Sequence, residues 1–190
     1  MPKFKKIAVV GVGLIGASLA AALKEFDPEI EITAVDRSAE SIKKAENLKI
    51  IDQGFTEISD NLAEAELIFI AVPVALIPKV IEEIEAGSKE KQLLVDLGST
   101  KKEIMLQAEK ILKDSSKLFI GAHPMAGSHK SGIDWHDPEL FKNAPFIITP
   151  TIEAVTDAEE IEKSNELSNS IKKAVAELKQ LVENIGARAY

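Results

Sequence analysis

The chain has 190 residues, of which 45% are hydrophobic and 28% are charged, a composition that is typical of a globular protein and argues against disorder. Its 23 basic and 31 acidic residues give a net charge of −8, and the scattered lysines predict no surface for nucleic acid or anionic lipid. The absence of cysteine excludes disulfides and thiolate metal sites, and no apolar run approaches the roughly 20 residues of a membrane span. We therefore expect a cytoplasmic protein whose partner is a small molecule.

Short apolar segments alternate along the chain with stretches of helical periodicity. Strands are predicted at 6–10, 31–35, 66–72, 92–97, 117–122 and 145–150, and helices at 14–25, 38–46, 74–86 and 101–113. This alternation is typical of a mainly parallel sheet with helices on both faces, so the sequence predicts an α/β protein. After a long glycine-rich connection at 121–144, helical spacing returns between 156 and 184, and "GARAY" predicts a final strand.

The first predicted strand is followed by a glycine-rich turn that leads into a helix. Gly11, Gly13 and Gly16 form the pattern GxGxxG, and Asp36 ends the second predicted strand 20 positions after Gly16. Glycines in this pattern allow a tight turn, close approach of backbone N–H groups to a pyrophosphate, and close packing of the helix on the strand. The sequence therefore predicts a doubly wound dinucleotide-binding domain of the Rossmann type.

Asp36 bears on the choice of cofactor. Its carboxylate is expected to accept hydrogen bonds from the ribose 2′-hydroxyl and to repel a 2′-phosphate, so NAD is preferred to NADP. Arg37 keeps NADP as an alternative, because an arginine beside the acid can bind a phosphate, although it can equally be a solvated surface charge. Val72 and Pro73 end another strand, where they either line the cofactor or only precede the next helix. The expected cofactor-binding residues are Gly11, Gly13, Leu14, Ile15, Gly16, Asp36, Arg37, Ser38, Val72 and Pro73.

Two later strands are followed by residues suited to proton transfer. Ser99 lies in the segment DLGSTK, after the strand over 92–97. Either Ser99 or Thr100 can instead cap the helix that begins near Lys101. His123 follows the next strand, and histidine is the side chain best suited to exchange a proton near neutral pH. Because a dehydrogenase that oxidises an alcohol needs a base, we predict His123 as that base and Ser99 as the hydroxyl that orients the substrate.

The glycine-rich connection carries the other two histidines of the chain. His129 is expected to be solvated, with a gating or binding role as the alternative, and His136 is expected to be structural or solvated. Three histidines without spaced carboxylates do not indicate a metal site.

Several motifs occur in one order along the chain: GVGLIGASLA, VDRS, AVP, DLGSTK, GAHPMAGSHKSGID and LFKNAPFIITP. With these motifs the chain resembles the prephenate/arogenate dehydrogenase family of tyrosine biosynthesis over about residues 5–150. The resemblance implies NAD-dependent oxidative decarboxylation of prephenate to 4-hydroxyphenylpyruvate, in which hydride passes to the nicotinamide and the ring carboxylate leaves as carbon dioxide. We expect one dinucleotide-binding domain over 1–190, with its core at about 5–150, and without the family's C-terminal helical domain.

The resemblance also implies roles for individual residues. His123 matches the family's histidine that polarises the ring hydroxyl, Ser99 matches the serine that helps to orient it, and Ser128 matches a hydroxyl residue near the substrate. His129 stands where many members have an acid, so the gating role of that acid is not expected to transfer. From its charge and position, Lys130 is expected to bind one substrate carboxylate.

The two carboxylates of prephenate set an expectation for the chain alone. They favour bidentate arginines, yet the only arginines are Arg37, which is committed to the nucleotide end, and Arg188, which lies near the C-terminus. We therefore expect the 190-residue chain to bind NAD, to turn over prephenate poorly, and to expose a surface that favours homo-oligomers. The alternatives are arogenate dehydrogenase, another NAD(P)-dependent dehydrogenase of the same fold, and a non-catalytic NAD-binding module.

Overall fold

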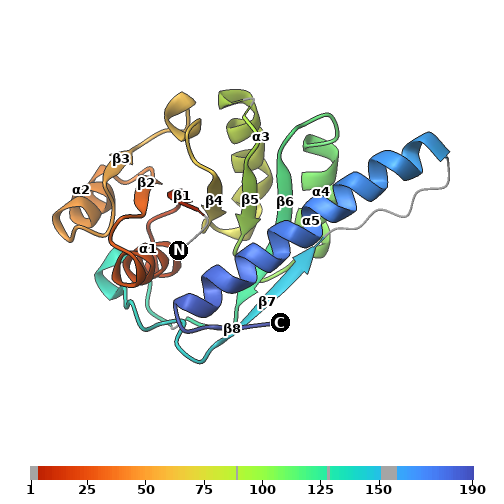
Figure 1. Ribbon diagram of the computed structural model, residues 1–190. Coiled ribbons are helices and arrows are strands. Elements are labelled where there is room, and N and C mark those ends of the chain that lie inside the picture. Colours follow the sequence, from red (N-terminus) through yellow and green to blue (C-terminus); the bar gives the residue numbers. More distant parts are fainter. Residues whose placement is uncertain (1–3, 89, 128, 151–157) are drawn as a thin grey trace.

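A computed structural model describes residues 4–88, 90–127, 129–150 and 158–190. Within these residues, eight strands form one sheet in the order β3-β2-β1-β4-β5-β6-β7-β8 (Figure 1). The strands are β1 (Lys6–Val10), β2 (Glu31–Val35), β3 (Gln53–Phe55), β4 (Leu67–Ile70), β5 (Leu93–Asp96), β6 (Leu118–Pro124), β7 (Pro145–Pro150) and β8 (Arg188–Ala189).

The first six strands of the sheet run in one direction. Strands β1 to β6 pair in parallel, β7 pairs with β6 in the antiparallel direction, and β8 is parallel to β7. The prediction of a mainly parallel α/β sheet is therefore confirmed. Because parallel strands share a direction, the carboxyl ends of β1 to β6 meet at one edge, where open α/β sheets bind their ligands.

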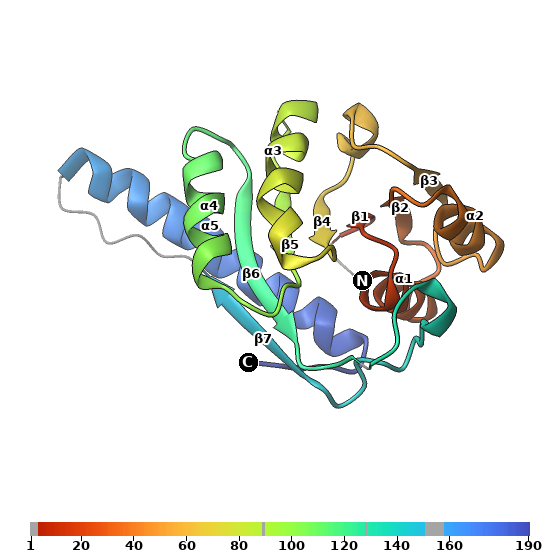
Figure 2. The same ribbon diagram turned by 180° about the vertical axis from the view of Figure 1, so that it is seen from behind.

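Helices cover both faces of the sheet (Figures 1 and 2). Helices α1, α2 and α5 pack on one face, and α3 and α4 pack on the other. The helices are α1 (Leu14–Phe26), α2 (Ala39–Asn47), α3 (Ile77–Gly87), α4 (Lys102–Ile111) and α5 (Ala158–Asn184), with short 3-10 helices η1 (Asp60–Leu62), η2 (Val74–Leu76) and η3 (Ile133–Trp135). In the described part of the chain, no helix is long and apolar enough to cross a membrane.

The central strands owe their continuous apolar sequence to burial on both sides. In β4, Leu67 and Phe69 belong to the core beneath α1 and α5, whereas Ile68 and Ile70 belong to the core beneath α3 and α4. All four side chains are fully buried. A parallel strand that is covered on both faces gains hydrophobic stabilisation from every position, which explains the apolar runs in the sequence.

Two strands differ from the sequence prediction in a way that affects the site. Strand β3 was not predicted, because three residues with Gly54 in the middle give no apolar run. Strand β6 continues through Pro124 instead of ending at 122, because antiparallel pairing with β7 places His123 opposite Ile147. His123 is therefore held in the sheet, and the connection to β7 begins after it.

Candidate functional site

The carboxyl edge of the sheet brings the predicted site residues together in the order of the strands. Gly11 follows β1, Asp36 follows β2, Val72 follows β4, Ser99 follows β5, and His123 lies next to the last residue of β6. Strand β2 is four strand spacings, about 19 Å, from β6. The glycine turn lies between these two ends, so a ligand would have to extend about this far along the edge to reach from Asp36 to His123.

The glycine turn after β1 has the geometry of an anion cradle. Gly11 has φ +97°, and a Cβ built on Gly16 would lie 1.9 Å from the Gly11 carbonyl oxygen, so α1 packs on the turn only because Gly16 has no side chain. A Cβ on Gly13 would meet no atom within 4 Å. Gly13 is the N-cap of α1 and makes no side-chain capping bond, which leaves the first N–H groups of the helix for a negatively charged ligand.

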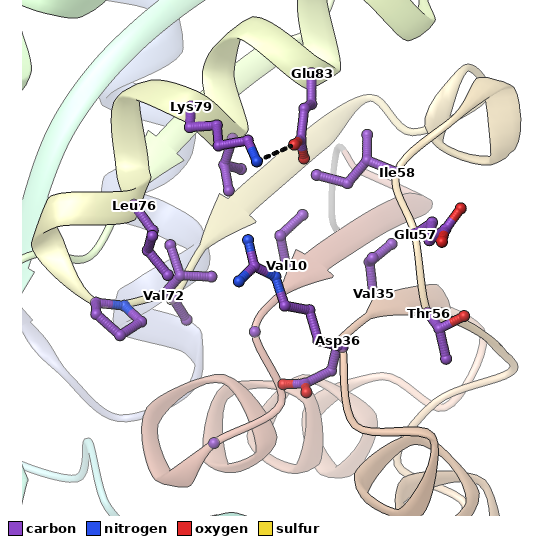
Figure 3. A pocket seen from close by; sticks show the side chains of 16 residues that line it. Val10, Val35, Asp36, Thr56, Glu57, Ile58, Val72, Leu76, Lys79 and Glu83 are labelled. Carbon is purple, nitrogen blue, oxygen red and sulfur yellow. Dashed lines mark ion pairs between the residues drawn. The ribbon is translucent and has the colours of Figure 1, made fainter.

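A cavity of ≈ 930 Å³ lies beside the cradle (Figure 3), a volume typical of small-molecule and cofactor sites. Six of the predicted cofactor residues line it: Gly11, Gly13, Asp36, Arg37, Val72 and Pro73. The other four do not line it, since Leu14, Ile15 and Gly16 form the first turn of α1 and Ser38 caps α2. Pro73 lines the cavity and is also the residue immediately before η2, so its role toward the cofactor stays a prediction.

The cavity is also lined by residues that the sequence analysis did not predict. Thr56, Glu57 and Ile58 follow β3, and they were missed together with that strand. Lys79 and Glu83, which form an ion pair of 3.5 Å along α3, line the side of the cavity that faces Asp36 (Figure 3). Their only sequence signal is their position in the helix that follows Val72 and Pro73.

Asp36 connects the cradle to the start of α2. Its carboxylate accepts hydrogen bonds from the backbone N–H groups of Val12 (2.7 Å) and Ser38 (2.9 Å). A carboxylate offers about four lone-pair positions, so two remain for the hydroxyl groups of a ligand. The side chain therefore shapes the cavity wall and keeps a negative charge at its surface.

The turn after β5 contains a buried ion pair. Asp96 is fully buried, and its carboxylate accepts hydrogen bonds from the Lys101 ammonium and from the Gly98 backbone N–H. Burial raises the pKa of the Asp96 carboxyl, an effect that the Lys101 ammonium opposes. Burial likewise lowers the pKa of Lys101, against the effect of Asp96. The pair fixes the turn on which Ser99 lies.

Ser99 and Thr100 are exposed at the top of this turn. The N-cap of α4 is Lys101, which makes no side-chain capping bond, so the structure does not show the capping role considered for Ser99 or Thr100. The Ser99 hydroxyl is consequently presented at the edge of the sheet beside β6.

His123 lies on the neighbouring strand and is half-buried. Its Nδ1 atom is buried and has no hydrogen-bond partner among the described residues. Buried polar atoms normally have a partner, so this nitrogen is a candidate for contact with a ligand. Together, β5 and β6 place a hydroxyl and an imidazole at adjacent strand ends.

The connection from β6 to β7 is closed at its base and anchored at its far end. The Met125 backbone N–H donates a hydrogen bond to the Pro145 carbonyl (2.8 Å). Farther along, the Asp137 N–H donates to the buried Ser18 hydroxyl on α1 (2.9 Å), and Asp134 forms an ion pair with Lys44 on α2. The connection therefore arches from the end of β6 to the helices on the far side of the cradle.

The polar residues of this connection have different environments. His129 and Lys130 are exposed, and the Lys130 ammonium lies 3.6 Å from the centre of the Trp135 ring. His136 is half-buried, and its Nδ1 lies 3.0 Å from the Ile133 carbonyl oxygen. Ser128, predicted from the resemblance, lies outside the described residues. The described part of the chain contains no cluster of three metal-ligating side chains.

Comparison with known proteins agrees with this arrangement. Residues 19–177 match the family described as prephenate dehydrogenase, nucleotide-binding domain. The prephenate dehydrogenase of Lactococcus lactis is 38% identical to this chain over 146 residues, which are 76% of this chain and 41% of that protein.

Solved structures show the same similarity. An arogenate dehydrogenase of Synechocystis superposes with a TM-score of 0.78 at 31% identity, over 97% of this chain and 58% of that one. The prephenate dehydrogenase of A. aeolicus in complex with hydroxyphenyl propionate and NAD+ has a TM-score of 0.78 at 28% identity, over 98% and 59%. The chain thus spans about two to three fifths of the length of these proteins. The resemblance inferred from the motifs is confirmed, and the chain belongs to the family of prephenate dehydrogenase nucleotide-binding domains.

Proposed function

We propose that this chain is the nucleotide-binding part of an NAD-dependent dehydrogenase that converts prephenate to 4-hydroxyphenylpyruvate in tyrosine biosynthesis. The observation that carries the proposal is the placement of Ser99 and His123 at adjacent strand ends, on the edge that also carries the glycine cradle. The L. lactis relative is named a prephenate dehydrogenase, and the A. aeolicus structure holds NAD+, which supports this choice of reaction and cofactor.

The cradle and the cavity fit the cofactor. The backbone at Gly11 and Gly13 and the amino end of α1 receive the pyrophosphate, because the Gly13 position is open and the helix end is uncapped. Asp36 accepts hydrogen bonds from the ribose hydroxyls and repels a 2′-phosphate, while Val72 and Pro73 line the wall. When bound, NAD supplies the acceptor for the hydride.

His123 and Ser99 act on the hydroxyl group of the substrate. The imidazole accepts a hydrogen bond from this hydroxyl and draws its proton away as hydride leaves the same carbon, and the exposed Ser99 hydroxyl keeps substrate and imidazole aligned. The bond from the ring to its carboxylate then breaks, carbon dioxide leaves, and the electron pair completes the aromatic ring. The proton returns to the phenolic oxygen, so the step releases no net proton, and aromatisation makes it effectively irreversible.

Two residues of the long connection complete this proposal. Ser128 is assigned to the substrate from the family motif, and Lys130 is assigned to one substrate carboxylate. In the structure the Lys130 ammonium lies over Trp135, so binding a carboxylate there means exchanging or sharing this cation–π contact. Arogenate is the second candidate substrate, because the Synechocystis neighbour is an arogenate dehydrogenase.

The test combines cofactor binding with a single turnover. Trp135 is the only tryptophan of the chain, so energy transfer from it to NADH reports binding directly. NADH formation from NAD is then followed with prephenate or arogenate, the protein being in excess so that slow chemistry is visible. We expect His123→Asn to bind NADH normally and to slow this turnover by about 10²–10⁴-fold. The matched control, His136→Asn, changes another histidine of the connection and is expected to react like the wild type.

The outcomes separate the alternatives. Turnover with prephenate that depends on His123 supports the proposal, and turnover with arogenate alone replaces the substrate. Binding of NADH without turnover in the wild type agrees with a nucleotide-binding part that does not form a complete substrate site by itself, since the chain spans only part of the length of its relatives. A protein that does not bind NADH contradicts the proposal altogether.

A further inference from the structure

The register of β6, β7 and β8 brings His123, Ile147 and Arg188 onto one face of the sheet. His123 lies opposite Ile147 in the pairing of β6 with β7, and Pro145 lies opposite Arg188 in the pairing of β7 with β8. Paired residues share a face of the sheet, and so do residues two positions apart in one strand. His123, Ile147 and Arg188 therefore share one face, whereas Phe146 faces the opposite core, where α5 packs.

This face is open where it meets the carboxyl edge. Met125 is 57% exposed, Ile147 38% and Tyr190 59%, although all three have large apolar side chains. In Figure 2, α4 lies beside β6, and no helix is drawn over the end of β6 or over the first part of β7. Arg188 is exposed and forms no ion pair with any residue of the described ranges. The face thus combines an apolar floor with one unpaired cation.

The spacing between the two polar groups suits a small ring compound. Arg188 is two strands away from His123 and two residues nearer the edge, which places their Cα atoms about 12 Å apart. Both side chains project from the same face, and the length of the Arg188 side chain is enough to cover part of this distance. Ile147 lies between them and can contact the flat side of a ring.

We propose that Arg188 binds a carboxylate of the substrate whose hydroxyl group His123 holds. This inference rests on the proposed function and adds to it a substrate-binding residue on β8. A guanidinium binds a carboxylate with two parallel hydrogen bonds, which orients a dicarboxylate more firmly than an ammonium does. Arg37, the other arginine, lines the cofactor cavity, and Lys101 is occupied by Asp96, so Arg188 is the cation that the described residues offer on this face.

The experiment measures prephenate binding by calorimetry to the chain saturated with NADH, a state in which no turnover occurs. Arg188→Ala is expected to weaken prephenate binding by about ten- to a hundredfold, the usual effect of losing a charge-assisted hydrogen bond. Arg188→Lys is expected to lie between this variant and the wild type. Lys172→Ala, which removes an exposed cation from α5, is the matched control and is expected to bind like the wild type.

Each outcome decides one question. Prephenate affinity that is unchanged in Arg188→Ala, while NADH still binds, overturns the inference and leaves the proposed function intact. A wild-type chain that binds NADH but no prephenate also overturns it, because the described residues then do not form a substrate site. Failure to bind NADH refutes the proposed function instead. Sedimentation of the same samples tests whether a second copy covers this face, and prephenate binding that falls as the chain associates overturns the inference.

Discussion

Lys101 passes over Gly121 of β6 to pair with Asp96, and the missing side chain of Gly121 leaves room for it. A Cβ on Gly121 would lie 3.0 Å from Lys101 Cδ and 2.7 Å from Met105 Sδ. The carboxylate at the end of this path is fully buried. One glycine in β6 therefore makes room for the ion pair that fixes the Ser99 turn.

The ion pair predicts a stability effect that is not additive. Lys101→Met is expected to lower the free energy of unfolding by about 3–5 kcal/mol at neutral pH, because it leaves the Asp96 carboxylate buried without its cation. The double variant Lys101→Met/Asp96→Asn removes both charges and is expected to be more stable than Lys101→Met alone. Urea unfolding of both variants and the wild type measures this, and equal stabilities of the single and double variants would contradict it.

The same variant predicts a dependence on pH. Burial holds the pKa of Asp96 above its ordinary value of 3.8, and without Lys101 that pKa rises further. For a group whose pKa is raised by folding, the stabilisation is complete below the unfolded pKa and is lost as the pH rises through the folded pKa. The destabilisation by Lys101→Met is therefore expected to be small below about pH 4 and to grow towards neutral pH. A difference from the wild type that stays constant over this range would show that the charge of Asp96 is not the cause.

Alanine substitutions at two glycines of the cradle are expected to have different effects, one on stability and the other on NADH affinity. Gly16→Ala is expected to cost at least about 2 kcal/mol of stability, because its Cβ would lie 1.9 Å from a backbone oxygen. Gly13→Ala has open space and an ordinary φ of −83°, so it is expected to fold like the wild type. Its methyl group lies where a pyrophosphate approaches, and NADH affinity is expected to fall about tenfold or more. Thermal unfolding and NADH titration separate the two effects, and normal NADH affinity in Gly13→Ala would refute the cradle.

Substitution of Asp36 is expected to change the preference between NADH and NADPH. Asp36→Asn removes the negative charge but keeps one oxygen to accept from the Val12 or Ser38 N–H, so the loss of stability is expected to be about 1–2 kcal/mol. The ratio of NADPH to NADH affinity is expected to rise about tenfold, since the repulsion of the 2′-phosphate is gone. Adding Arg37→Ala is expected to reverse part of this gain. Titration with both cofactors measures the ratio, and an unchanged ratio would exclude Asp36 as the determinant.

Much of the fold could be predicted because its signals are local. Strand β4 is buried on both faces, and such strands have continuous apolar sequences. The cradle could be predicted because Gly11 and Gly16 must lack a Cβ for the turn to close on α1. The match of residues 19–177 to the family model confirms the resemblance that the later motifs carry.

The remaining features depend on contacts between distant segments. The extension of β6 through His123 requires pairing with β7, and the place of Arg188 on the same face depends on the register of β8 with β7. The residues after β3 were missed because a three-residue edge strand is stabilised mainly by its neighbour β2, and its own sequence carries little signal. The hydrophobic pattern within one segment gives no information about which other segment it pairs with.

Because β7 runs antiparallel to β6, the carboxyl edge of the sheet is formed by the last residues of some strands and by the first residues of others. Strands β1 to β6 have their last residues at this edge. Strands β7 and β8 run the other way and have their first residues there, Pro145 and Arg188. The cavity is lined from the first group, and the open face beside His123 is built largely from the second. With the proposed role of Arg188, changes at the starts of β7 and β8 are expected to alter which substrate is bound while the residues that line the cavity stay the same. A lineage can in this way acquire a new substrate and retain its cofactor.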